Sequence, residues 1–474
     1  MAPSRALLAI MLVVAACGGT AETTTSTTAL PSSTTVTSTT VASTTSTTVP
    51  GTTTVEPQNP PDVIFYGGTM LTMNPDQPVA QAVSIRDGMI VAVGPQIPLL
   101  TQAGPDTIIV DLAGRTLMPG FVDAHTHILN QGNYGAGFEE RQSAALANGI
   151  TTLANMYSEA DFLAAMESFA ADGHLRVRTS LYMVYNRACG DLVGEWYLDR
   201  PPTREPGEML RIGGVKVFAD GGSCNSPSFT TQIAEDVVLV PPYVTVEELT
   251  GVIERAQAAG HQVAVHAVGD RAIDTVLDAM EAAIGDGENT LRHRIEHNSV
   301  VRPDHYPRYG EIGMVATIFA EYPSCAPFGA PLFPEYQDWE WPYDELLAAN
   351  PDVHFAWHGD APSFSIDPLK QLFGFVTRYD VAADGTLCEP WPWLADDTIP
   401  VEDALALMTT DSAYAIFRET EVGALRPGLY ADLIVLSDNP VAVDPFDIKD
   451  IAVLMTMVGG QTEYCAAGSE EICP

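Results

Sequence analysis

The sequence predicts an α/β protein whose body is a TIM-like (β/α)8 barrel, preceded by a small β-rich module. Three observations support this fold class. The body contains eight short apolar runs of strand length, helical periodicity separates most of these runs, and hairpin-like patterns precede the first of them. Eight such units favour a barrel. A doubly wound open sheet is the alternative, because strand boundaries are the least certain product of sequence patterns.

The N-terminal segment is predicted to be an export signal. Residues 1–5 carry one basic side chain, residues 6–16 form a short apolar run, and small residues lead into Cys17. This pattern resembles a lipobox, so residues 1–17 are expected to be a lipoprotein signal peptide with Cys17 as the lipidated residue. An ordinary secretory signal is the alternative. The lipobox predicts an exported protein that is lipid-anchored to the outer face of the bacterial cell membrane.

Residues 18–61 are predicted to be a disordered tether. They consist mainly of Thr and Ser with scattered Pro, a composition that cannot bury a core. No later stretch reaches the roughly 18 uninterrupted apolar residues that a membrane-spanning helix needs. Contact with the membrane is therefore expected only through the lipid at Cys17.

Residues 62–118 are predicted to form the β-rich module. Segments 63–66 and 69–72 have the pattern of two strands around a Gly67-Gly68 turn. Segments 82–85 and 89–93 flank an Asp87-Gly88 turn, and segments 107–111 and 115–118 surround Ala113-Gly114. Three hairpins are therefore expected before the barrel begins.

Residues 119–418 are assigned to the barrel. The expected strands are 120–124, 151–154, 176–182, 214–219, 262–266, 293–297, 313–319 and 353–358. Between them, segments 246–259 and 271–284 place apolar residues at the three- and four-residue spacing of amphipathic helices. Alternation of such strands and helices is typical of parallel βα units.

Charge and cysteine content limit the partners and the compartment. The 474 residues include 22 Lys+Arg and 61 Asp+Glu, a formal net charge of −39, which repels phosphate backbones and argues against nucleic-acid binding. With Cys17 taken by lipid, six cysteines remain, an even set that suits an exported protein. Cys465 and Cys473, in a polar tail at 461–474, are the best candidates for a local disulfide.

Potential metal ligands follow the predicted strands. His125 and His127 are two residues apart at the end of the first strand, so on extended backbone they point the same way and can bind one ion. His266 ends the fifth strand, His297 ends the sixth, and Asp360 follows the eighth. Barrel enzymes place their catalytic groups at these carboxyl ends, so a metal site is expected there.

Lys216 lies within an apolar strand segment, Val215-Lys216-Val217, where a cation is costly unless it is paired or chemically altered. A desolvated lysine can lose its proton and add carbon dioxide. The resulting carbamate is a carboxylate that can bridge two divalent ions about 3.5–4 Å apart. A salt bridge to a barrel carboxylate is the alternative role for Lys216.

These residues occur in the order and strand contexts of the amidohydrolase superfamily. The segments 265–274 (VHAVGDRAID) and 294–298 (RIEHN) resemble the amidohydrolase 3 family, including its YtcJ-like metal-dependent hydrolases. Segment 423–436 (GALRPGLYADLIVL) is similar to the stretch with which these proteins return to their N-terminal β-module. The resemblance covers roughly residues 62–460, and it implies that residues 419–460 complete a β-sandwich module built from both flanks.

The resemblance also implies roles for the candidate ligands. One divalent ion would be bound by His125, His127 and Asp360, and a second by His266 and His297. Lys216, carboxylated by carbon dioxide, would bridge the two ions. Asp360 would also act as general base and acid, with a bridging hydroxide as the nucleophile. Zinc is the first expectation for such a site, although manganese, iron or cobalt suits the same ligands.

The implied function is hydrolysis of a non-peptide C–N bond, of amide type, in a small-molecule substrate. One alternative keeps the metal site but hydrolyses an ester, a lactone or a phosphoester. A second alternative is a tethered solute-binding lipoprotein without catalysis. The segment His358-Gly359-Asp360 differs from the Gly-Ser-Asp that relatives often carry, and this difference leaves the substrate more open than the reaction class.

Overall fold

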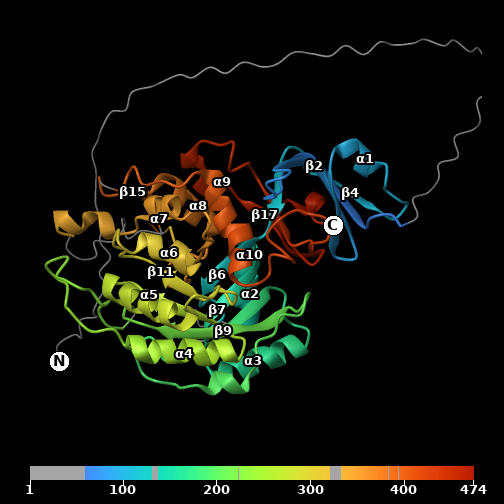
Figure 1. The fold of residues 1–474 in the computed structure, drawn as a ribbon. Helices are drawn as coiled ribbons and strands as arrows, with labels where there is room; N and C mark the ends of the chain where they lie inside the picture. Colours follow the sequence, from blue (N-terminus) through green and yellow to red (C-terminus); the bar gives the residue numbers. More distant parts are fainter. Residues whose placement is uncertain (1–58, 131–136, 223, 321–331, 383, 393) are drawn as a thin grey trace, which may run out of the picture.

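The computed structural model describes residues 59–130, 137–222, 224–320, 332–382, 384–392 and 394–474. Two large sheets organise them, an all-parallel barrel and a mixed sheet beside it, visible in Figure 1 as the green-to-orange body and the blue-and-red lobe. The predicted signal peptide, Cys17 and most of the predicted tether lie outside the described residues. Within the described part of the chain, no helix has both the length and the apolarity needed to cross a membrane.

Eight parallel strands form the barrel, in sequence order around the sheet. They are β6 (Phe121–Thr126), β7 (Ile150–Ser158), β8 (Arg178–Val184), β9 (Leu210–Phe218), β10 (Gln262–Ala267), β11 (Arg294–His297), β12 (Val315–Ile318) and β13 (Phe355–Trp357). Each overlaps one of the eight predicted strands. The predicted (β/α)8 barrel is therefore confirmed, and the open doubly wound sheet is not what the chain forms.

Helices connect most of the barrel strands and cover the outside of the barrel (Figure 1). The connecting helices are α2 (Phe138–Ala147), α3 (Ala160–Ala171), α4 (Val246–Ala258), α5 (Asp270–Ile284), α6 (Tyr306–Ile312) and α7 (Tyr343–Ala349), and α8 (Pro368–Thr377) follows the last strand. Helix α4 starts with a capping box in which Thr245 and Glu248 each accept a hydrogen bond from the other's backbone N–H. The two helices predicted from periodicity correspond to α4 and α5.

Strands from both flanks form one mixed sheet of eight strands, in the order β18-β17-β16-β5-β1-β2-β3 with β4 beside β1. The N-terminal flank supplies β1 (Val63–Leu71), β2 (Val79–Arg86), β3 (Met89–Gly94), β4 (Ile108–Asp111) and β5 (Thr116–Pro119). The C-terminal flank supplies β16 (Leu433–Leu436), β17 (Val453–Val458) and β18 (Gln461–Cys465). The module thus draws on both ends of the described chain.

Two of the three predicted hairpins are wrong. Residues 63–71 form a single strand, β1, in which Gly67 and Gly68 make a bulge because β2 continues to pair on both sides of them. Gly67 has a φ of +75°, and a Cβ there would lie 2.0 Å from a carboxylate oxygen of Asp111. Strands β4 and β5 each pair in parallel with β1 instead of with each other. Only β2 and β3, around Asp87-Gly88, form the expected hairpin.

A buried ion pair fastens the mixed sheet to the barrel. Arg178, on β8, donates from Nε and Nη2 to the two carboxylate oxygens of Asp432 at 2.6 and 3.0 Å. Asp432 also accepts the backbone N–H of Gly459 at 2.7 Å, and its carbonyl accepts the N–H of Gly120. Because Gly120 immediately precedes β6, this junction fixes the entry of the first barrel strand.

Two disulfides join described residues. Cys465 and Cys473 are bonded across eight positions in the tail, the pairing that the sequence suggested. Cys189 and Cys224 are bonded as well, with Cα atoms 5.2 Å apart. The second bond connects the segments that follow β8 and β9, both at the carboxyl ends of barrel strands.

Candidate metal centre

The carboxyl ends of the barrel strands surround a cavity of about 570 Å³. Predicted ligands and aromatic side chains line it together: His127, His266, His297, Asp360, Tyr157 and Phe218. A cavity of this size admits a small organic molecule. These four candidate ligands are therefore accessible to a substrate from the side where barrel enzymes carry out their chemistry.

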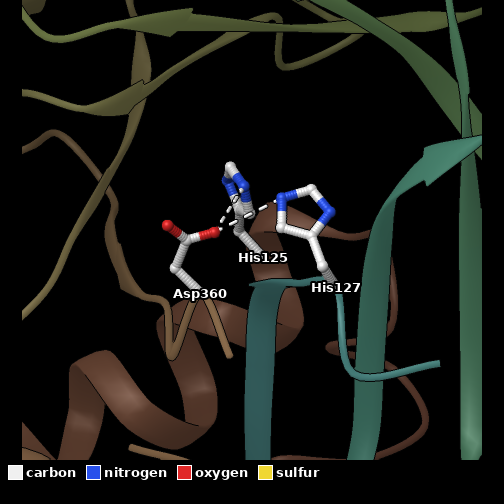
Figure 2. A group of neighbouring side chains, drawn as sticks. All are labelled: His125, His127 and Asp360. Atoms are coloured by element: carbon white, nitrogen blue, oxygen red, sulfur yellow. Dashed lines mark ion pairs between the residues drawn. The ribbon is translucent and has the colours of Figure 1, made fainter. Parts of the chain in front are cut away.

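His125, His127 and Asp360 form the first group of potential ligands (Figure 2). One donor atom from each lies within 4.8 Å of the other two, a spacing that can hold a metal ion. The Asp360 oxygen Oδ1 is 3.4 Å from His125 Nε2 and 3.3 Å from His127 Nε2. Neutral imidazoles with a carboxylate are common ligands of zinc and related divalent ions.

Backbone hydrogen bonds at the barrel seam hold this group in place. The N–H of His127 donates to the carbonyl of Ala361 at 2.9 Å, and the N–H of Asp360 donates to the carbonyl of His125 at 3.0 Å. The carboxylate of Asp123 accepts the N–H of His125 at 3.2 Å and that of Gly359 at 2.9 Å. The first and last barrel strands are thus joined next to the ligands they carry.

Glu296 orients His125 from inside the barrel. It is fully buried on β11, and its Oε2 lies 2.6 Å from His125 Nδ1. Arg294 donates to both Glu296 oxygens, at 2.6 and 2.8 Å. Burial would raise the pKa of Glu296, but the charge and hydrogen bonds of Arg294, together with the charge of Lys216, hold the pKa below its usual value. An ionised Glu296 accepts a hydrogen bond from Nδ1–H, which places the lone pair of His125 on Nε2, where it can bind a metal ion.

His266 and His297 form the second group, on the neighbouring strands β10 and β11. Their ring centroids are 4.4 Å apart. His266 Nε2 lies 2.9 Å from the carbonyl oxygen of Gly221, and Tyr343 donates its hydroxyl to the backbone carbonyl of His297 at 2.9 Å. These two imidazoles alone make only two donors, so a full set for a second ion requires a further ligand between the groups.

Asp220 shapes the loop that contacts His266. Its two oxygens accept the backbone N–H groups of Val268, Gly269 and Ser228 at 3.1, 2.9 and 3.0 Å. Burial raises the pKa of Asp220 to about 7. The sequence analysis did not single out this residue, which ties the segment after β9 to the segment after β10.

Lys216 lies between the two groups on β9. It is fully buried, and its Nζ is 3.4 Å from His125 Nε2 and 4.9 Å from the centre of the Phe218 ring. Burial lowers the pKa of Lys216 to about 8, against an opposing effect of the Glu296 charge. Within the described ranges, no carboxylate oxygen comes within ion-pair distance of Nζ. The salt bridge considered for Lys216 therefore does not occur among these residues.

Three of the candidate ligands, His125, His266 and His297, are held in the neutral form that binds metals. Burial and then the Lys216 charge lower the pKa of His266 to about 3. The same two causes, in the same order, lower the pKa of His125 well below its ordinary value. A neutral imidazole offers a lone pair to a metal ion, whereas a protonated one does not.

Sequence reasoning missed two side chains that lie beside the six predicted ligands, Glu296 and His358. Glu296 was visible as the third residue of the motif 294–298, where alternation on a strand places it on the same face as Arg294. His358 was visible only as a departure from a family pattern. It is fully buried, with its ring stacked 5.0 Å from that of His125.

Fold and ligand groups together define a class: a parallel (β/α)8 barrel whose strand ends carry a group able to hold a divalent ion. Comparison with known sequences makes the assignment specific. The profile of the Amidohydrolase family matches residues 130–464, more than half of the chain. The chain therefore belongs to the amidohydrolase family, as the motifs of the sequence suggested.

Individual relatives agree with the assignment. The YtcJ protein of Bacillus subtilis (strain 168) is 27% identical over 274 residues, 54% of this chain and 48% of the relative. The N-substituted formamide deformylase of Arthrobacter pascens is 27% identical over 271 residues, 55% of this chain and 47% of the relative. The chain thus spans about half the length of these curated relatives.

A solved structure supports the fold. The crystal structure of an uncharacterized metal-dependent hydrolase from Pyrococcus horikoshii OT3 superposes with a TM-score of 0.66, at 19% sequence identity. The superposition covers 81% of this chain and 99% of that one. At this identity the likeness concerns the architecture of barrel and flanking sheet.

Proposed function

We propose that the protein is a binuclear metal-dependent hydrolase that cleaves a non-peptide C–N bond of amide type in a small molecule. The observation that carries the proposal is the grouping of His125, His127 and Asp360, with donor atoms within 4.8 Å of one another, two of which, His127 and Asp360, line the cavity. A second histidine pair and a buried lysine stand beside this group. The similarity to a formamide deformylase favours an amide over other acyl derivatives.

The residues present fit a pair of divalent ions. His125, His127 and Asp360 would hold one ion, and His266 and His297 would hold the other. Imidazole nitrogens and carboxylate oxygens are ligands that zinc prefers. When bound, such ions lower the pKa of water and polarise a substrate carbonyl. Manganese, iron or cobalt would serve the same ligands.

Asp360 is the residue proposed to move the proton. Burial alone would raise its pKa, but the hydrogen bond from His127 and the nearby positive charges hold the pKa of Asp360 below its ordinary value. The carboxylate is thus ionised and able to accept a proton from the attacking water. The protonated acid can then return this proton to the leaving amine nitrogen, which departs as a neutral amine.

Lys216 is proposed to complete the second ligand set as a carbamate. Because burial lowers its pKa to about 8, a substantial fraction of Lys216 is neutral near physiological pH. The neutral Nζ forms an N–C bond to carbon dioxide and loses one proton. The product is a carboxylate positioned between the two histidine groups, and it replaces a buried cation by an anion that metal ions can neutralise.

Metal content and substrate preference test the proposal together. About two divalent ions per chain, measured by elemental analysis of protein purified without chelator, are expected to accompany activity. Side-by-side rates on amide and ester panels with the same acyl groups distinguish amide hydrolysis from ester, lactone or phosphoester hydrolysis. Protein without bound metal would instead support a tethered solute-binding role.

Export and anchoring at Cys17 are proposed on sequence grounds alone. The apolar run and the small residues before Cys17 support lipidation. Mass spectrometry of the N-terminal peptide from a bacterial host, compared for the parent and Cys17→Ser, tests this. An unmodified Cys17 in an exported parent would favour an ordinary secretory signal.

A further inference from the structure

His358 is a buried histidine that the proposed ligand sets leave unused. It directly follows β13, and its side chain has no exposed surface. Neither ring nitrogen, Nδ1 or Nε2, has a hydrogen-bond partner among the described residues. Two other buried imidazoles of the centre differ in this respect, because His125 contacts Glu296 and His266 contacts the Gly221 carbonyl.

The surroundings of His358 belong to both ligand groups. Its ring is stacked on that of His125, with centroids 5.0 Å apart and planes inclined by 29°. The His297 ring meets it edge-on at 4.8 Å, and the Phe319 ring lies 5.1 Å away. His358 therefore touches one histidine of each group, and Asp360 follows it by only two residues.

An imidazole in such a position has a free-energy cost that a hydrocarbon side chain would avoid. Burying a polar group without a partner is unfavourable by about 1–3 kcal/mol on mutational scales. Buried groups of this kind in folded proteins usually mark a partner that is not protein, an ion or a water molecule. Stacking alone does not explain the nitrogens, because a phenylalanine would stack on His125 equally well.

We propose that His358 is a further imidazole donor of the metal centre, in addition to the four histidines predicted as ligands. This inference rests on the proposed metal-dependent function. The centre then contains five imidazoles, and the fifth comes from the segment directly after β13 that also carries Asp360. An internal water bound to His358 is the competing explanation, and it predicts no effect of His358 on metal binding.

His358→Phe is the variant that separates these explanations. It keeps an aromatic ring against His125 and removes both nitrogens. His261→Phe is the matched control, because His261 is equally buried but precedes β10, at the opposite end of that strand from His266. Each full-length variant is freed of metal, titrated with Zn²⁺ against a chromophoric chelator, and then loaded with Co²⁺ to record its visible absorption spectrum.

Loss of His358 as a donor is expected to weaken Zn²⁺ binding by roughly tenfold or more and to change the Co²⁺ absorption bands. The metal-free His358→Phe protein is expected to melt at or above the temperature of the metal-free parent, since an unpaired polar group has been removed. His261→Phe is expected to leave the Zn²⁺ affinity and the Co²⁺ spectrum unchanged.

Zn²⁺ affinity and a Co²⁺ spectrum like those of the parent in His358→Phe would overturn the inference and favour the internal water. That result would leave the proposed function intact, provided that the parent binds about two ions. A parent that binds no metal would instead refute the proposed function and, with it, the role of His358. The melting of the metal-free variants identifies a His358→Phe protein that has simply failed to fold.

Discussion

Replacing Glu296 by glutamine tests whether this carboxylate prepares His125 for metal binding. In the parent, Glu296 accepts hydrogen bonds from Arg294 at 2.6 and 2.8 Å and lies 2.6 Å from His125 Nδ1. Thr317 donates its hydroxyl to the same carboxylate at 3.0 Å. Glutamine keeps one oxygen acceptor but loses the negative charge, so Arg294 becomes a buried cation without a counter-ion.

Two effects of different size are expected in Glu296→Gln. Breaking a buried ion pair by removing one partner destabilises a fold by about 3–5 kcal/mol, and Glu296 and Arg294 are both fully buried. Loss of the carboxylate that orients a metal-binding histidine typically weakens metal binding by about 10–100-fold. The first effect should appear in urea unfolding of the metal-free protein, and the second in a chelator titration at a temperature where the variant is folded.

Glu421→Gln is the matched control. Glu421 is buried and pairs with Arg211 and Arg418. Arg211 lies near the start of β9, five residues before Lys216, hence roughly 16 Å from it along the strand. Loss of the Glu421 charge should destabilise the fold by an amount similar to that in Glu296→Gln and leave the metal affinity unchanged. If both variants bind metal as tightly as the parent, or if both lose affinity equally, the orienting role of Glu296 is refuted.

Three further predictions concern single parts of the molecule. Asp360→Asn should lower turnover by about 10²–10⁴-fold, because proton transfer is lost, while most of the bound metal remains in elemental analysis. The metal-free, CO2-free parent should become more stable as the pH rises from 8 to 10.5, and Lys216→Met should abolish this gain in stability. In that range the unfolded lysine, with a pKa of 10.5, binds a proton that the folded one, with a pKa of about 8, does not. Urea unfolding at pH 7 and 10.5 should therefore show the parent gaining about 3 kcal/mol relative to this variant, and parallel pH profiles would contradict the pKa. Replacing Cys465 and Cys473 by serine should lower stability by about 2.5 kcal/mol, as expected for a disulfide that closes a loop of eight positions, and an unchanged urea midpoint would contradict this.

The barrel could be predicted from sequence because its strands are apolar runs with helices between them. Their lengths were harder to predict. Strand β7 runs from Ile150 to Ser158, well beyond the predicted 151–154, because the polar side chains of Asn155 and Ser158 are buried in a barrel where both faces of a strand are covered. The glycine pair at 67–68 was predicted as a turn, since local sequence does not reveal a neighbouring strand that continues past a bulge.

The site was predictable where its residues act alone and unpredictable where they act through partners. His125 and His127 show their role by spacing on one strand, whereas the role of Glu296 depends on a histidine 171 positions earlier in the chain. His358 is recognisable only through what surrounds it, namely rings from β6 and β11 and the absence of a hydrogen-bond partner among the described residues. Contacts of this kind arise from barrel closure and have no local signature.

Barrel closure and metal binding draw on the same residues. The first and last strands, β6 and β13, are joined at their carboxyl ends by backbone hydrogen bonds from His127 to Ala361 and from Asp360 to His125. An ion held by His125, His127 and Asp360 would therefore cross-link the two strands at the seam where the barrel sheet is nearly closed. Because a ligand that binds only the folded state stabilises it by mass action, we expect the metal to strengthen the barrel at this seam. The residues that perform the proposed chemistry thus also complete the fold that positions them.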